Sequence, residues 1–447
     1  MESFNWIVLG DFIETLTDYH ANGSYKILKK NIELKRSPDY AIMIRTLNFE
    51  RPDFENDLIY LDEKEYNYLK KTKVYPNDIL MNKIANPGSV YLMPNINMPV
   101  SLAMNLFLIR FNREVNQVFM FYLMKTNESY IKKFANGTTT LTITKDSVKG
   151  LNFKVPPKST QDNIAKTLSD IDKKIELNNK INAELESMAK LIYDYWFVQF
   201  DFPDANDKPY KSSGGKMVYN EALKREIPEG WEVRDLGDLI KVERGISYKS
   251  SEITENGTPM INLNSFSLTG KYKSAGLKYF SGTYRQNKVV AAGDLVIAIT
   301  DVTRNADIIG KAFTIPALFG KDILISCDVA KIVPSKLINN QFLEPLFNSR
   351  HYHNYIKHFA SGTLVLHLNL DGLMWCKIPL PPKKLLDRYS EFRQNIDRKI
   401  TLSIKENQKL SELRDWLLPM LMNGQVTVKD SYNQRKQRKL KHGSSIF

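Results

Sequence analysis

Two short segments combine residue types that occur in catalytic sites. Residues 86–89 (Asn-Pro-Gly-Ser) begin like the Asn/Asp-Pro-Pro-aromatic motif with which adenine methyltransferases hold the target amino group, but they lack the second proline and the aromatic residue. Asp53 and residues 62–64 (Asp-Glu-Lys) could supply two carboxylates and a lysine to a metal-dependent nuclease. Because such spacings are common in charged loops, we expect neither segment to be catalytic.

Three histidines and two cysteines are the remaining candidates for metal or redox chemistry. His351, His353 and His358 could bind zinc, but residues two apart on a helix point in different directions, so we expect surface histidines and no metal site. Cys327 and Cys376 belong to no Cys-x-x-Cys motif, so the sequence predicts no disulfide framework. The chain also lacks the Gly-x-x-x-x-Gly-Lys-Ser/Thr loop that binds ATP phosphates.

The elements that would position any site form an internal repeat. Residues 129–138 (SYIKKFANGT) match residues 354–363 (NYIKHFASGT), which lie 225 residues further along the chain. The same offset aligns the Pro-Pro pairs at 156–157 and 381–382, and the motifs Ile-Asp-Lys-Lys-Ile at 171–175 and Ile-Asp-Arg-Lys-Ile at 396–400. A colinear series of matches over nearly the whole chain predicts two copies of one structural unit.

Each copy reads as an α+β globule followed by one long helix. Strands are predicted at residues 41–49, 78–84 and 100–111 of copy one, and at 259–263, 294–300, 311–316 and 323–333 of copy two. A helix follows in each copy, near residues 114–134 and 340–359. We divide the chain into a first globule (1–157), a central helix (158–200), a linker (201–226), a second globule (227–382), a C-terminal helix (383–424) and a basic tail (425–447).

The two long helices, residues 159–197 and 384–422, carry apolar residues with the 4-3 spacing of a coiled coil. A helix of 39 residues is about 58 Å long, too long to pack inside one small globule. We expect the helices to pack antiparallel as a spacer, with an approximate two-fold axis. Asn182 and Asn407 would then pair and set the register, or both face solvent. The seam residues are Ile171, Ile175, Asn182, Leu185, Ile396, Ile400, Asn407 and Leu410.

The composition indicates a globular protein with an anionic partner. The chain has 447 residues, 43% of them hydrophobic, and a formal net charge of +13, which favours DNA, RNA or an acidic membrane surface. The most apolar stretch, residues 100–111, is short and is interrupted by Asn105, so we expect no membrane span. The first residues are mixed and acidic, unlike a signal peptide, so we expect a cytoplasmic protein.

The order of these motifs resembles the specificity subunits of type I restriction-modification enzymes. Residues 227–238 (IPEGWEVRDLGD) resemble the opening of a target-recognition domain of that family, and residues 195–203 (YWFVQFDFP) resemble the end of its central helix. The turns at 135–138 and 360–363, each followed by Pro-Pro and a long helix, resemble its domain ends. Copy one departs from the pattern, because it keeps only Trp6 and residues 9–11 (Leu-Gly-Asp) of the opening.

The resemblance implies a division of labour. Each target-recognition domain reads one half of a split, asymmetric target in double-stranded DNA, while the helices set the gap and dock two modification subunits. The modification subunits hold S-adenosylmethionine, and restriction subunits supply ATP- and Mg²⁺-dependent translocation and cleavage. This chain would bind no cofactor and catalyse nothing. The alternatives are the specificity chain of another DNA modification or defence system, a self-contained DNA-modifying enzyme, and a homodimeric regulator of one palindromic site.

Loops that differ between the copies are the candidates for reading bases, because shared residues cannot distinguish two half-sites. The repeated Gly-Thr turns, with Thr138 and Thr363, are candidates for phosphate contact or for a structural turn. The candidates in copy one are Asn22, Lys26, Lys29, Lys30, Arg45 and Lys83. The candidates in copy two are Arg244, Tyr248, Lys249, Arg285, Lys288, Arg304, Asn305 and Lys311.

Overall fold

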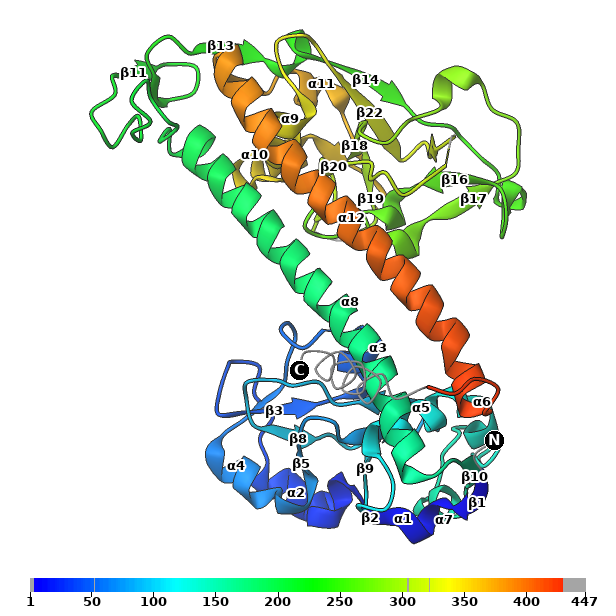
Figure 1. Cartoon of the computed structure of the whole chain (residues 1–447). Helices are drawn as coiled ribbons and strands as arrows, with labels where there is room; N and C mark the ends of the chain where they lie inside the picture. The colour runs from blue at the N-terminus through cyan, green and yellow to red at the C-terminus, as the bar shows by residue number, and fades with distance from the viewer. Residues whose placement is uncertain (1–3, 52, 304, 321, 429–447) are drawn as a thin grey trace, which may run out of the picture. The chain divides into compact units, whose positions relative to one another are not determined.

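The computed structural model describes residues 4–51, 53–303, 305–320 and 322–428 (Figure 1). The chain divides into two compact units, and both long helices contribute to both of them. Unit 1 comprises the residues up to Glu176 together with those from Gln408, and unit 2 comprises Leu177–Asn407. The long helices are α8 (Lys158–Tyr193), prolonged by the π-helical turn η3 (Asp194–Val198), and α12 (Lys383–Met422).

The described residues of unit 1 form two four-stranded sheets and a strand pair. The first sheet is antiparallel, and the second contains one parallel pair, β3 with β8. The first sheet has the order β2 (Ile13–Asp18), β9 (Leu106–Phe111), β6 (Ile79–Asn82), β7 (Val90–Leu92). The second has the order β4 (Tyr60–Leu61), β3 (Ala41–Ile44), β8 (Val100–Leu102), β5 (Lys73–Val74), and β1 (Asn5–Val8) pairs with β10 (Asn152–Val155).

The main core of unit 1 joins the first sheet to its helices. Ile109 of β9 and Phe119 of α5 are fully buried in one cluster with Leu168 of α8 and Leu421 of α12. The long helices are therefore part of this core, which explains why they belong to the unit. The shorter helices are α1 (Leu9–Phe12), η1 (Tyr19–Asn22), α2 (Tyr25–Asn31), α3 (Thr46–Glu50), α4 (Glu63–Tyr68), η2 (Lys70–Thr72), α5 (Gln117–Thr126), α6 (Glu128–Lys132) and α7 (Lys145–Lys149).

Unit 2 repeats this plan. Its antiparallel first sheet has the order β14 (Ile240–Arg244), β22 (Val329–Pro334), β18 (Leu295–Ala298), β20 (Ala312–Thr314). Its second sheet has the order β15 (Ile253–Thr254), β17 (Lys278–Phe280), β16 (Thr258–Ile261), β21 (Leu324–Ile325), and again holds one parallel pair, β16 with β21. Smaller pairings join β13 (Glu232–Asp235) with β25 (Lys377–Leu380), β11 (Met217–Asn220) with β12 (Arg225–Pro228), and β19 (Thr300–Asp301) with β24 (Leu366–Leu368) and β23 (Ala360–Ser361).

The core of unit 2 is rich in aromatic rings. Phe197 of η3 and Tyr389 of α12 meet edge to face at 5.1 Å, and Phe342 of α9 meets Phe197 at 5.0 Å. Such pairs add to the burial free energy, so both long helices are again anchored in the core. The shorter helices are η4 (Leu236–Asp238), η5 (Ser250–Glu252), η6 (Leu263–Ser265), η7 (Ser274–Gly276), η8 (Gln286–Lys288), α9 (Asn340–Asn348), α10 (Arg350–Ile356), η9 (Lys357–Phe359) and α11 (Leu370–Met374).

The long helices run antiparallel within each unit, as expected (Figure 1). In unit 2, Asn178 Nδ2 donates to Asn407 Oδ1 at 2.8 Å, while Tyr389 OH donates to the carbonyl oxygen of Ala189 at 3.4 Å. The predicted pairing of Asn182 with Asn407 is wrong. Antiparallel packing places Asn407 opposite Asn178 rather than opposite its counterpart in the repeat, and Asn182 Oδ1 is buried without a hydrogen-bond partner in the described residues.

The remaining seam residues face inward to different extents. Ile396 is buried, whereas the others are half-buried. Apolar residues half-covered along a helix are consistent with a pair of helices rather than with a deep bundle. The half-buried residues are Ile171, Ile175, Leu185, Ile400 and Leu410.

Several predicted elements are shorter than expected. The strand predicted at residues 100–111 is two strands, β8 and β9, and that at 323–333 is also two, β21 and β22. The helix predicted at 114–134 breaks at Asn127. The helix predicted at 340–359 breaks at Ser349, whose Oγ accepts from the backbone N–H of Tyr352 and so caps α10. Local capping therefore interrupts apolar patterns that look continuous in sequence.

The predicted linker, residues 201–226, contains ordered structure. It includes β11 and the first residues of β12, and the ring of Phe202 stacks on those of Tyr210 and Trp231 at 4.7 and 5.4 Å. Part of the predicted tail is also ordered, because Val426 and Val428 pack against the core of unit 1. The rest of that tail, from residue 429, lies outside the described residues. None of the described helices is long and apolar enough to cross a bilayer.

Candidate nucleic-acid interface

Two carboxylates considered for a metal-dependent site have local structural roles. Asp62 caps α4 by accepting from the backbone N–H of Glu65 at 2.8 Å, and Asp53 accepts from the backbone N–H of Asn56 at 2.8 Å. His351 and His358 are exposed and His353 is half-buried. Among the described residues, no group of three His, Cys, Asp or Glu side chains is arranged to hold a metal ion.

In unit 1, one asparagine holds together the loops that carry the exposed lysines. Asn22 of η1 donates through Nδ2 to Thr72 Oγ1 at 2.9 Å and accepts at Oδ1 from the backbone N–H of Lys71 at 3.0 Å. Helix α2 packs against η1, and η1 packs against η2. The side chain of Asn22 therefore holds η1 and η2 together by hydrogen bonds. We call the exposed cations of these elements basic surface 1: Lys26, Lys29, Lys30, Lys70 and Lys71.

In unit 2, a second group of cations includes two that line an open depression of about 580 Å³. Arg285 and Lys288 line the depression, and Lys288 Nζ donates to the carbonyl oxygen of Arg244 at 2.8 Å. Lys278 Nζ donates to the hydroxyl of Tyr248 at 3.2 Å and lies 5.4 Å from its ring centre. We call this group basic surface 2: Arg244, Lys249, Lys278, Arg285 and Lys288.

The two basic surfaces occupy the same place in the repeated fold. Each follows the first strand of the first sheet, β2 or β14, and includes the segment that leads to β6 or β18. Asp78 and Asp294 close the equivalent turn before β6 and β18, where they accept from a backbone N–H three residues earlier. Each also pairs with a cation of the neighbouring strand, although at different positions of that strand: Arg110 at 2.6 Å and Lys331 at 2.7 Å. A common framework thus presents loops of different sequence.

Three of the candidate cations are engaged inside the fold. Lys83 Nζ lies 2.8 Å from Asp18 Oδ2, and both side chains are nearly covered. Lys311 is buried, its Nζ donates to the carbonyl oxygen of Asn348 at 3.4 Å, and burial lowers the pKa of this lysine. Arg45 donates to the carbonyl oxygen of Asp57. The structure therefore brings none of the three onto either basic surface.

The repeated Gly-Thr turns have a backbone explanation. Gly137 and Gly362 have φ values of 137° and 138°, and a Cβ at either position would lie 2.2 or 2.0 Å from a carbonyl oxygen. Only glycine fits such a turn. Thr138 and Thr363 are exposed beside these glycines, and Asn305 is exposed as well. Arg304 lies outside the described residues.

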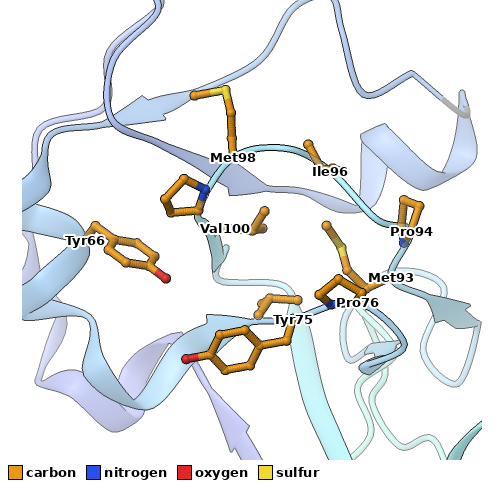
Figure 2. Close-up of a pocket in the computed structure, with 10 residues that line it drawn as sticks. Tyr66, Tyr75, Pro76, Met93, Pro94, Ile96, Met98 and Val100 are labelled. Carbon is orange, nitrogen blue, oxygen red and sulfur yellow. The ribbon is translucent and has the colours of Figure 1, made fainter.

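A cavity of about 260 Å³ in unit 1 was not expected from the sequence (Figure 2). Its lining is largely apolar and includes Tyr66, Tyr75, Met93 and Met98. Tyr75 is half-exposed, and the guanidinium of Arg110 lies 5.0 Å from its ring centre. The lining residues supply no acid–base pair. Sequence reasoning missed it because the sheet joins residues far apart in the chain.

We expect Lys83→Met to lower the stability of unit 1 rather than to remove a DNA contact. Although burial acts to raise it, the pKa of Asp18 lies below its usual range because Lys83 and Lys145 donate to the carboxylate. Loss of one partner from this covered pair is expected to cost about 1–3 kcal/mol in the free energy of unfolding, measured by urea denaturation. Since the pKa is lowered, this stabilisation is present above the usual carboxyl pKa and is lost as the pH falls.

The control for this prediction is Lys26→Met, on the exposed surface of α2. It should leave the urea midpoint unchanged and weaken DNA binding. A Lys83→Met protein with unchanged stability and reduced DNA affinity would contradict the structural role of this lysine.

Comparison with known proteins gives a match over most of the chain. The family model described as type I restriction modification DNA specificity domain matches residues 5–187 and again residues 228–412. The specificity subunit of type I restriction enzyme MjaVIII from Methanocaldococcus jannaschii is 27% identical over 325 residues, which are 71% of this chain and 72% of that protein. The specificity subunit of type I restriction enzyme HindI from Haemophilus influenzae is 26% identical over 408 residues, 80% and 88% of the two chains.

A solved structure has a similar fold. The S subunit of a type I restriction-modification system from M. genitalium superposes with a TM-score of 0.55 at 16% sequence identity, covering 94% of this chain and 96% of that chain. At this level of identity the likeness concerns the fold alone. The two matches of the family model coincide with the two copies of the repeat.

Proposed function

Because this chain belongs to the family of type I restriction modification DNA specificity domains, we propose that it is the subunit through which such a complex selects its DNA target. Unit 1 would read one half of a bipartite, asymmetric sequence in double-stranded DNA and unit 2 the other half. The observation that supports this proposal is the placement of basic surfaces 1 and 2. They share a framework but differ in sequence, as two independent readers require.

The finer division of labour is also part of the proposal. We assign no catalytic step and no cofactor to this chain. S-adenosylmethionine would bind to two modification subunits, and ATP and Mg²⁺ to the restriction subunits. The complex would work in the cytoplasm, where its DNA lies.

An apolar stripe on each long helix supports docking of two copies of the same partner. Three exposed apolar side chains of α8 recur on α12 at the repeat offset of 225 residues. By helical periodicity, the three positions lie on one face of each helix. On α12 this face is opposite to the one that carries the seam residue Asn407. Exposed large apolar side chains that recur at matching positions of a repeat are candidates for an interaction site. The pairs, with their exposed fractions, are Leu177 (52%) with Leu402 (63%), Met188 (43%) with Leu413 (44%), and Leu191 (63%) with Trp416 (56%).

The test of this function is to express the chain with the modification subunit encoded beside it and to map methylated adenines in the host DNA. We expect one asymmetric motif made of two specific blocks and a fixed gap. A single palindromic motif would instead indicate a homodimeric regulator or reader. Methyl transfer from S-adenosylmethionine by this chain alone would indicate a self-contained enzyme.

The affinity of the assembled complex for DNA should fall steeply as the salt concentration rises. If the five cations of each basic surface all contact phosphates, the slope of log K against log salt concentration would reach about −9, since each contact contributes roughly −0.9. Fluorescence anisotropy with a labelled duplex between 50 and 200 mM salt, about a fourfold range, would measure it. A binding constant that hardly changes over this range would argue against both surfaces.

A further inference from the structure

Both long helices carry an aspartate at the same place in the repeat. Asp172 lies in the Ile-Asp-Lys-Lys-Ile motif of α8, and Asp397 lies in the Ile-Asp-Arg-Lys-Ile motif of α12. The isoleucines of these motifs belong to the helix seam. Asp172 contacts the globule directly through Tyr122, whereas Asp397 contacts Arg393 of its own helix, which in turn reaches Glu344 of the globule. Each aspartate sits at a junction between its helix and the globule of its own unit.

In unit 1, the carboxylate of Asp172 joins three helices. It accepts a hydrogen bond from the hydroxyl of Tyr122 on α5, and its other oxygen accepts from Arg414 Nη1 of α12 at 2.8 Å. Tyr122 is 4% exposed, so its hydroxyl has little access to water. Burial and the hydrogen bond to Asp172 raise the pKa of Tyr122, which therefore remains a donor.

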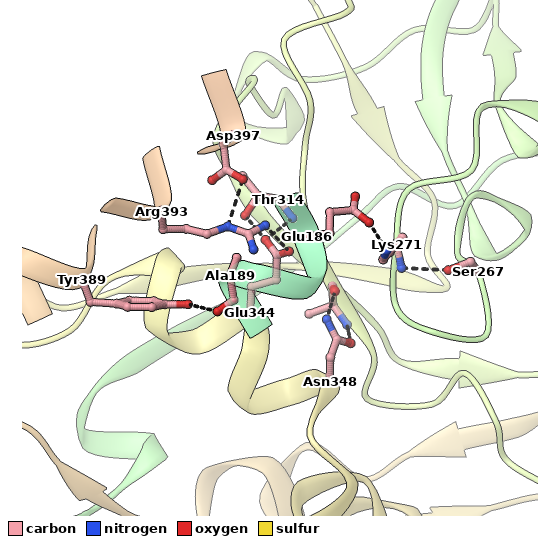
Figure 3. Close-up of polar contacts among 11 residues, drawn as sticks. Glu186, Ala189, Ser267, Lys271, Thr314, Glu344, Asn348, Tyr389, Arg393 and Asp397 are labelled. Atoms are coloured by element: carbon pink, nitrogen blue, oxygen red, sulfur yellow. Dashed lines mark hydrogen bonds and ion pairs between the residues drawn. The ribbon is translucent and has the colours of Figure 1, made fainter. Parts of the chain in front are cut away.

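In unit 2, Asp397 begins a row of charged groups that leads into the globule (Figure 3). Its carboxylate lies 2.9 Å from Arg393 Nε, and Arg393 Nη2 lies 3.5 Å from Glu344 Oε1 of α9. The other oxygen of Glu344 accepts from the backbone N–H and the hydroxyl of Thr314 in β20, at 3.0 and 2.5 Å. The row therefore links α12 to a helix and to a strand of the globule.

Helix α8 is held to the same globule by its own contact. Glu186 of α8 forms an ion pair with Lys271, in the loop that follows η6 (Figure 3). The loop backbone is itself fixed, because the N–H of Lys271 donates to Ser267 Oγ at 2.9 Å. Both long helices are therefore tied to the globule of unit 2 by charged side chains.

The residues around the two equivalent aspartates differ in type between the two junctions. The residue of copy one that corresponds to Arg393 is Leu168, which is fully buried in the core of unit 1. Covered ion pairs add little net stability because desolvation offsets their attraction, but charge-assisted hydrogen bonds fix direction. An aspartate is present at the same position of both long helices, although its partners differ. A requirement for a fixed orientation of the globule explains this better than a requirement for stability.

We propose that Asp172 and Asp397 are positioning residues that hold each globule at a fixed orientation on the long helices, so that the complex distinguishes the length of the gap between half-sites. This inference rests on the proposed function, because a gap has meaning only if each unit reads one half-site. The aspartates touch no DNA in this scheme. They act through Tyr122 and Arg414 in unit 1, and through Arg393 and Glu344 in unit 2.

The test compares the full complex carrying Asp172→Asn or Asp397→Asn with the unmodified complex. Affinity is measured on duplexes with the native gap and with gaps one base pair shorter or longer. It is also measured on duplexes in which one half-site is scrambled. We expect the preference for the native gap to fall about tenfold, as the loss of one charge-assisted hydrogen bond predicts, while the affinity for a single half-site stays within about twofold.

Two further variants keep the test decisive if an asparagine variant folds poorly. Tyr122→Phe removes the hydroxyl that donates to Asp172, while keeping the aspartate itself, and should lower the gap preference in the same direction, but less. Asp170→Asn is the matched control, because Asp170 is exposed on α8 and, in the part of the chain that the structure describes, its ion pair is with Lys166 of the same helix. It should leave the gap preference unchanged.

Two results would overturn the positioning role. One is an unchanged gap preference in Asp172→Asn, Asp397→Asn and Tyr122→Phe. The other is a parallel loss of gap preference and of single half-site affinity, which would indicate general destabilisation. If the unmodified complex shows no gap preference at all, the proposed function itself fails, and that outcome is read from the unmodified protein alone.

Discussion

Replacing Arg244, Lys249 and Arg285 together by alanine is expected to weaken DNA binding by the complex about 10²–10³-fold, with the whole loss on one half-site. All three side chains are exposed on basic surface 2. A lost contact to a base or phosphate costs about 1 kcal/mol or more, so three contacts correspond to at least about two powers of ten in affinity. If all three contact phosphates, the salt slope should also become shallower by about 2.7.

The measurement uses duplexes in which either half-site has been scrambled. The variant should lose affinity for the duplex that keeps the half-site of unit 2 and bind the other duplex as before. The matched control removes three exposed lysines elsewhere in unit 2, Lys208, Lys211 and Lys336, which changes the net charge equally. Equal losses on both half-sites, or an equal effect of the control, would refute independent reading by the two units.

The reciprocal experiment replaces Lys26, Lys29 and Lys30 of α2 by alanine. These residues lie three and four positions apart and therefore share one face of the helix. The loss should now fall on the half-site of unit 1. Asn22 is unsuitable for this comparison because its amide clamps η1 to η2, so its loss would disturb the surface as a whole.

The internal repeat and the spacing of apolar residues in the sequence predicted the architecture well. The offset of 225 residues gave both copies, and the first sheets of units 1 and 2 indeed share one strand order. The second sheets differ, because the outer strand β5 lies beside β8 in unit 1, whereas the outer strand β15 lies beside β17 in unit 2. The 4-3 spacing gave both long helices to within a few residues at either end. The spacing did not predict which residue lies opposite Asn407. How far one antiparallel helix is shifted along the other depends on the packing of both helices against the globules. That packing involves Tyr389 and Phe197, which lie outside the spacing pattern.

The binding residues were harder to predict than the fold. Composition does not distinguish Lys83, which is paired with Asp18, from Lys26, which is exposed. The partner lies 65 positions away in the chain, so only the folded sheet brings it close. Lys278 was not among the candidates because it lies in none of the loops chosen from the sequence. The fold places this residue, the first of β17, beside Tyr248 on basic surface 2.

Replacing Leu413 and Trp416 by aspartate should leave the complex with one modification subunit instead of two. These residues belong to the apolar stripe of α12 and are exposed in this chain, so the exchange should leave the fold intact. A partner that buries these two positions in its interface would have to bury two carboxylates without a counter-charge, which is unfavourable. We expect the affinity for that partner to fall at least about 10³-fold, as for apolar anchors of an interface. Native mass spectrometry of the purified complex counts the subunits.

The repeat supplies both the companion variant and the control for this prediction. Met188→Asp with Leu191→Asp changes the equivalent positions of α8 and should remove the other modification subunit, while all four changes together should remove both. Gln408→Asp places a carboxylate on an exposed position of α12 outside the stripe and should change nothing. Retention of both subunits by all variants would show that the partner docks elsewhere. Loss of both subunits in a two-residue variant would show that the two docking events are not independent.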